Sequence, residues 1–213
     1  MTEKILSTVA TVTRELNSSK RNVEKLGALA RGLRWHRQWD DQDLAALLAL
    51  GKLAQDKRGA GCWLVEQAVL EILCDRAERD HVPFLSETFR RKTPGQHSND
   101  RRRLALQALS GLAARTGDDL ALYLLEEGLA HHKKDTRGWA IGFLMDAYLG
   151  LKRPLPPSAI DRLQFLVDTD ISPDVRVEAV TALANLGLVD QHRVDAVITT
   201  ARQNLNGSGE HTH

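Results

Sequence analysis

The sequence predicts an all-α protein, an α-α superhelix of about five helix pairs with an N-terminal capping helix. A motif with an arginine in the first helical turn recurs at intervals of 35 to 44 residues, which is the period of helix-pair repeats. Valine and threonine are scattered instead of alternating, so no strand is indicated. Residues that begin and end helices separate the copies of the motif.

The clearest copy of the motif lies between residues 171 and 188. Ser172 is a favourable N-cap, Pro173 suits the first helical position, and Gly187 is a typical C-terminal stop. Small and apolar residues follow Arg176 at helical spacing, which indicates a buried stripe that a neighbouring helix can approach closely.

The same offsets recur after Arg102 and Arg137, and weaker copies begin near Arg58 and Arg21. A second helical run follows each copy. These runs are expected over residues 41–55, 82–92, 118–131, 158–168 and 190–204. With the N-terminal helix they complete five pairs and a cap.

The pattern Asp-x-Arg-x-x-Ala-x-x-Ala/Phe-Leu resembles HEAT-type repeats, in particular the bacterial HEAT repeats that also occur in phycobilisome lyases. The resemblance covers residues 56–204 and, more weakly, residues 20–55. It implies an α-solenoid in which recurring aspartates and arginines form a structural ladder between successive repeats. The residues that match the ladder are Asp100, Arg102, Asp135, Arg137, Asp174 and Arg176.

The chain is expected to form one continuous domain over residues 1–204, followed by a flexible tail over 205–213. Charged residues interrupt the N-terminal segment, and no stretch reaches the roughly 20 apolar residues of a membrane span. Cys62 and Cys74 would lie about 18 Å apart on one helix, too far to bridge. Reduced thiols indicate a cytoplasmic protein without a membrane partner.

No catalytic or cofactor motif emerges from the chain. Gly59 and Gly61 lack the third glycine and the preceding strand of a dinucleotide fingerprint. The adjacent His131 and His132 diverge by about 100° on a helix and suit no shared metal. We therefore expect no enzyme activity, no cofactor and no metal site.

A DNA glycosylase of the HEAT-like kind is a minor alternative. The sites of such enzymes combine tryptophans with an aspartate, and Trp139 and Asp146 are seven residues apart, roughly on one helix face. The motif of that family cannot be matched residue by residue, so the likeness is one of fold.

Two pairs of tryptophans need an interpretation. Trp35 and Trp39 would share one face if the first helix continued through them, either as an aromatic anchor for a partner or as a packing plug. The plug is favoured because a large ring is usually mostly buried. Trp63 and Trp139 are expected in the core.

The leading functional prediction is a non-enzymatic adaptor that binds a partner protein through a concave face built from the second helices. Residues expected on that face are Glu126, Glu127, Asp161 and Gln164, with Trp35 and Trp39 as further anchors. Since this face leans acidic, the expected partner presents a basic segment or helix.

The alternative is a nucleic-acid-binding protein, in a DNA repair or defence complex, that uses a basic rim over residues 90–103 and 133–137. Loops that precede the first helix of each pair fall along one edge of a helix-pair array. Basic residues gathered there are Arg90, Arg91, Lys92, Arg101, Arg103, Lys133 and Lys134. Net charge does not favour either partner, since 29 lysines and arginines face 28 acidic residues. The oligomeric state is not indicated.

Overall fold

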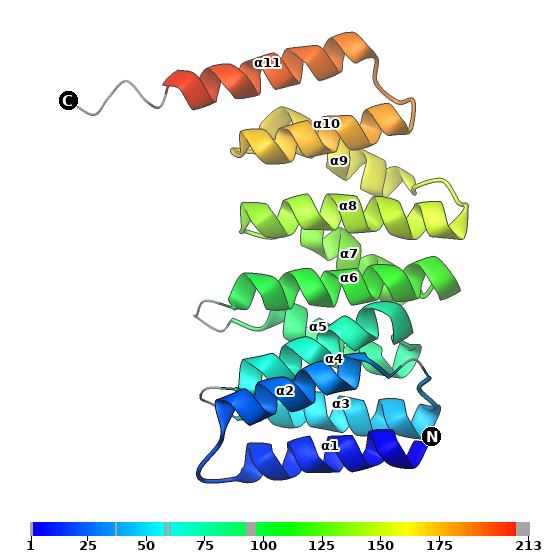
Figure 1. Ribbon diagram of the computed structural model, residues 1–213. Helices are drawn as coiled ribbons and strands as arrows, with labels where there is room; N and C mark the ends of the chain where they lie inside the picture. The colour runs from blue at the N-terminus through cyan, green and yellow to red at the C-terminus, as the bar shows by residue number, and fades with distance from the viewer. Residues whose placement is uncertain (1, 37, 58, 60, 93–96, 208–213) are drawn as a thin grey trace, which may run out of the picture. The chain divides into compact units, whose positions relative to one another are not determined.

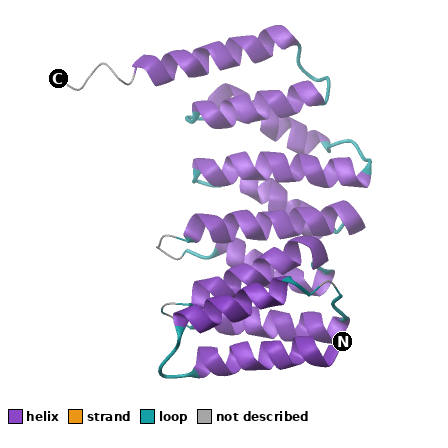
Figure 2. Ribbon diagram, in the orientation of Figure 1, coloured by secondary structure: helices purple, strands orange, loops and turns teal. Residues whose placement is uncertain are grey.

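The computed structural model describes residues 2–36, 38–57, 59, 61–92 and 97–207. Within these ranges it holds eleven α-helices, one short 3-10 helix and no strand (Figures 1 and 2). The helices are α1 (Thr2–Asn17), α2 (Val23–Arg34), α3 (Asp41–Asp56), α4 (Cys62–Arg76), η1 (Arg79–His81), α5 (Val82–Arg90), α6 (Ser98–Thr116), α7 (Asp119–Leu129), α8 (Lys134–Leu151), α9 (Pro157–Thr169), α10 (Pro173–Asn185) and α11 (Gln191–Gly207). None of them is both long and apolar enough to cross a lipid bilayer.

The predicted all-α class and its order of helices are confirmed. The five predicted second runs correspond to α3, α5, α7, α9 and α11, and α1 is the predicted N-terminal helix. The helix α11 continues through Gly207, so the beginning of the predicted tail is helical. Residues 208–213 of that tail lie outside the described residues, and the single-domain prediction stays a prediction.

Side chains at the helix starts explain several helix boundaries. Asp40 caps α3 by accepting from the Asp43 amide at 2.8 Å, and Asp43 accepts in return from the Asp40 amide at 3.3 Å. Asp118 accepts from two amides in the first turn of α7. After α10, Gly187 adopts a left-handed φ of 70°, so the predicted stop is confirmed.

The chain divides into two compact units, Met1–Gly111 and Leu112–His213. In the first unit, α1 packs against α2 and α3, and both α2 and α3 pack against α4. In the second unit, α8 packs against α7 and α10, α9 packs against α7 and α10, and α11 covers α10. Within each unit, helices of the same kind in successive pairs therefore lie against each other.

Close helix packing in the first unit depends on Gly51 of α3. A Cβ atom at this position would lie 2.9 Å from side-chain atoms of both Phe84 and Val69. Phe84 is 1% exposed and Val69 is fully buried. Glycine therefore lets α3 approach α4 and α5 closely, and each fully buried large apolar side chain contributes about 1.5–3 kcal/mol to folding.

Candidate binding surfaces

The second helices of the second unit expose large apolar side chains. On α7, Leu120 is 51% exposed and Tyr123 is 58% exposed; on α9, Phe165 is 52% exposed. The two helices contact each other. We call their solvent-exposed side the α7/α9 face. Exposed aromatic side chains on neighbouring helices are typical of a protein-binding surface.

Two of the four predicted partner-binding carboxylate and amide residues lie one helical turn from these apolar side chains. Glu127 is one turn beyond Tyr123 on α7, and Asp161 is one turn before Phe165 on α9. Asp161 is exposed, whereas Glu127 and Gln164 are half-buried. The structure thus places these predicted residues on two contacting helices.

Glu126 is the fourth of these residues, and it is half-buried. Burial raises the pKa of its carboxyl group above the ordinary value. The pKa of Tyr148 on α8 is also raised, first by burial and then by the negative charges of Glu126 and Asp119. Since no cation among the described residues pairs with Glu126, this carboxylate is partly desolvated without compensation.

Two arginines moderate the acidic character of α9. The Arg162 guanidinium lies 4.9 Å from the centroid of the Phe165 ring. Arg193 of α11 forms an ion pair with Asp168 at 2.9 Å. The partly buried Glu126 and the exposed Asp161 add negative charge to α7 and α9.

The tryptophans behave differently from their prediction. The helix α2 ends at Arg34, so Trp35 and Trp39 do not share a helix face. The Trp35 side chain is 84% exposed, and the packing interpretation is therefore wrong for it. Trp39 is half-buried, and its indole N–H donates to the His36 carbonyl at 2.9 Å. Trp39 lines a cleft of about 310 Å³.

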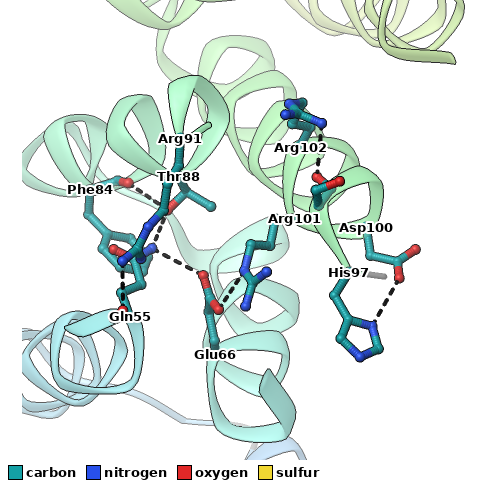
Figure 3. Close-up of polar contacts among 10 residues, drawn as sticks. Gln55, Glu66, Phe84, Thr88, Arg91, His97, Asp100, Arg101 and Arg102 are labelled. Atoms are coloured by element: carbon teal, nitrogen blue, oxygen red, sulfur yellow. Dashed lines mark hydrogen bonds and ion pairs between the residues drawn. The ribbon is translucent and has the colours of Figure 1, made fainter. Parts of the chain in front are cut away.

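A buried polar network lies in the first unit, between α3, α4 and α5 (Figure 3). The Gln55 amide donates to Thr88 Oγ1 at 2.6 Å and to Glu66 Oε1 at 3.3 Å. Glu66 is 1% exposed, and its second carboxylate oxygen accepts from Arg101 Nε at 2.8 Å. Arg91 Nη2 donates to the Gln55 carbonyl at 2.7 Å. The network holds two arginines in fixed positions.

Beside this network, Trp63 takes part in an aromatic stack. The ring of Trp63 lies 4.9 Å from that of His97 with an interplanar angle of 12°, and the Arg101 guanidinium is 4.9 Å from the Trp63 ring. These side chains line a cleft of about 610 Å³ together with Lys57 and Arg91. The predicted core position of Trp63 is wrong, because its ring is half-buried at the edge of this cleft.

The basic residues of the predicted rim divide into two groups. Arg91, Arg101 and Arg103 contact neighbouring groups of the fold, Arg103 through Gln107 Oε1 at 3.4 Å. Arg90, Lys92 and Lys133 have exposed side chains, and the exposed Lys134 forms an ion pair with Asp174. The five rim residues from Arg90 to Arg103 belong to the first unit, and Lys133 and Lys134 belong to the second.

The arginines assigned to the ladder have different partners. Arg137 forms a bidentate ion pair with Asp170, through Nε–Oδ2 at 2.6 Å and Nη2–Oδ1 at 2.7 Å. Arg102 is 6% exposed and bonds locally to Ser98 and Asn99. The Nε atom of Arg176 is buried and has no hydrogen-bond partner among the described residues.

Two of the ladder aspartates have partners other than these arginines. Asp100 lies 3.7 Å from His97, Asp174 pairs with Lys134, and Asp135 is exposed. First helices of successive pairs are instead joined by other ion pairs, such as Arg34–Glu71 at 2.6 Å and Arg101–Glu66. The position of an arginine in the first helical turn therefore does not predict which acidic residue pairs with it.

Trp139 and Asp146 both line a groove of about 450 Å³ between α8 and α10. Phe143 and Met145 make much of its wall apolar. Trp139 is half-buried instead of lying in the core as predicted.

Within the described ranges, no group of three or more histidine, cysteine, aspartate or glutamate side chains is arranged to hold a metal ion. Comparisons of the chain with protein-family models, curated proteins and solved structures return no match.

Proposed function

We propose that this protein is a non-enzymatic adaptor that binds a partner protein through the α7/α9 face. The observation that carries the proposal is the exposure of Tyr123 and Phe165 on two contacting second helices. Aromatic side chains gain much free energy when a partner covers them, and they dominate many protein interfaces.

The charges beside these rings indicate the chemistry of the partner. No cation among the described residues pairs with the partly desolvated Glu126 carboxylate, and the exposed Asp161 adds negative charge. A lysine or arginine of a partner would supply the missing charge. The proposed partner segment is therefore basic and amphipathic, with apolar side chains that cover Tyr123 and Phe165.

Site-specific photo-crosslinking tests this proposal. A photoreactive phenylalanine analogue replaces Tyr123 in one variant and Leu149 in another, and both variants are irradiated in nuclease-treated lysate. Leu149 is the matched control, because it is an apolar residue of α8 that is 78% exposed. We expect one protein to be crosslinked from position 123 and not from position 149.

Equal crosslinking from both positions would show that exposed apolar side chains capture proteins without specificity, and the proposal would fail. A crosslink that forms in untreated lysate but not in nuclease-treated lysate would instead favour a nucleic acid as the mediator. In that case Arg90 and Lys92 of the first unit and Lys133 of the second unit are each substituted in turn.

A further inference from the structure

A second candidate site is the cleft of about 610 Å³ beside the buried network of the first unit. Its lining comes from the end of α3, the start of α4, Arg91 after α5, and the start of α6. This volume falls in the range of small-molecule sites. None of the residues that line the cleft belongs to the α7/α9 face, so this proposal and the adaptor proposal rest on different residues.

Positive charge exceeds negative charge on the walls of this cleft. Lys57, Arg91 and Arg101 contribute three cations, and Asp56 is the acidic residue among the described lining residues. Glu66 lies beneath the surface, 1% exposed, where Arg101 neutralises it. Three cations against the carboxylates of Asp56 and Glu66 leave one excess positive charge at the cleft, which favours an anion.

The two guanidinium groups are held in place and still have free donors. Arg101 uses Nε for Glu66, while Arg91 uses Nη2 for the Gln55 carbonyl (Figure 3). The Arg101 guanidinium also lies against the Trp63 ring. The other N–H groups of both arginines have no acceptor among the described residues. The same is true of the Lys57 ammonium group. Donors held in advance lose little entropy when they bind a ligand.

We propose that this cleft binds a small phosphate-bearing molecule. Two fixed guanidinium groups and one ammonium group match the several oxygens and the double negative charge of a phosphate. Access favours a small ligand over a nucleic-acid backbone, because the Arg101 side chain is only 20% exposed and is reached from inside the cleft. Trp63 and His97 form an aromatic wall beside the phosphate position.

Isothermal titration calorimetry on the full chain tests the proposal with inorganic pyrophosphate, adenosine monophosphate and a short single-stranded oligonucleotide at matched ionic strength. We expect saturable one-to-one binding of pyrophosphate or of the monophosphate. Lys57→Gln and Arg91→Gln should each weaken this binding about tenfold, since each removes one charge-assisted contact. Lys52→Gln is the matched control, because Lys52 is an exposed residue of α3 outside the cleft and should leave binding unchanged.

Lys57→Gln keeps the proposal testable if Arg91→Gln disturbs folding, because the Lys57 ammonium group has no hydrogen-bond or ion-pair partner to lose among the described residues. Absence of saturable binding for both small ligands would overturn the proposal, as would an equal loss in Lys52→Gln. An oligonucleotide that binds more tightly than pyrophosphate and depends on Lys57 would assign the cleft to nucleic acid instead.

Discussion

The ion pair between Arg137 and Asp170 offers a quantitative test of how the second unit is held together. Its side chains are 10% and 3% exposed, and two hydrogen bonds of 2.6 and 2.7 Å join them. Close by in sequence, Lys134 and Asp174 form a pair at 3.3 Å with side chains that are 59% and 64% exposed. The two pairs have the same charges and differ in burial.

Asp170→Ala removes both charge-assisted bonds and leaves a buried guanidinium group. Breaking a buried pair typically costs about 3–5 kcal/mol. Arg137 Nη1 keeps its bonds to the His131 and His132 carbonyls, so we expect a loss near the lower limit, about 3 kcal/mol. Asp174→Ala should cost no more than about 1 kcal/mol, because water screens the exposed pair.

Urea unfolding followed by far-UV circular dichroism measures these differences in the free energy of unfolding. Arg137→Met in the Asp170→Ala background should recover part of the loss, because it removes the unpaired charge. Equal losses for Asp170→Ala and Asp174→Ala would refute the reasoning that burial determines the strength of these pairs.

Four further outcomes are expected. Gly51→Ala should destabilise the protein by about 1–3 kcal/mol in the same urea assay, because the added Cβ overpacks the core. Gly32→Ala should instead stabilise it by about 0.5–1 kcal/mol, because a Cβ at this position meets nothing within 4 Å. Burial raises the pKa of Asp170, but the hydrogen bonds from Arg137 and from the Ser172 amide outweigh it, so the pKa is lowered. The stabilisation of the fold by the Asp170 carboxylate is therefore complete above the ordinary aspartate pKa and is lost as pH falls through the lowered value. Asp170→Asn should remove this part of the acid dependence of the urea midpoint. Burial, followed by the negative charges of Asp75 and Glu71, raises the pKa of Cys74 to about 12. Iodoacetamide should therefore alkylate Cys74 at least about a hundredfold more slowly than an unhindered peptide thiol at mildly alkaline pH, as measured by mass spectrometry. Partner binding should weaken as pH falls through the raised pKa of Glu126, since protonation removes the negative charge that attracts a basic segment. A titration of binding affinity against pH should show no such step for Glu126→Gln.

The fold was predictable because its signals are local. Pro173 begins α10 as expected, Gly187 ends it, and the apolar stripe after Arg176 predicts its buried side. Each signal depends on the conformation of one helical turn or on the period of one helix, which the sequence contains directly.

The binding surfaces were only partly predictable, because they depend on contacts between distant residues. Glu66 and Arg101 are 35 residues apart, and neither is marked locally as a partner of the other. Trp63 fits the core by residue type, but its place beside His97 at a cleft depends on how α4 and α6 meet. The exposure of Tyr123 and Phe165 could have been predicted from the sequence, since both are large aromatic residues that lie outside the buried stripes of their helices.

The most direct test of the adaptor proposal is the affinity of the partner that is crosslinked from position 123. Its dissociation constant is measured for the unmodified chain, for the double variant Tyr123→Ala/Phe165→Ala, and for Leu149→Ala as the control of similar exposure. The proposal predicts at least about a hundredfold weaker binding for the double variant and no change for the control, since two central aromatic residues each contribute about 2 kcal/mol or more. Equal affinity for all three proteins would contradict it.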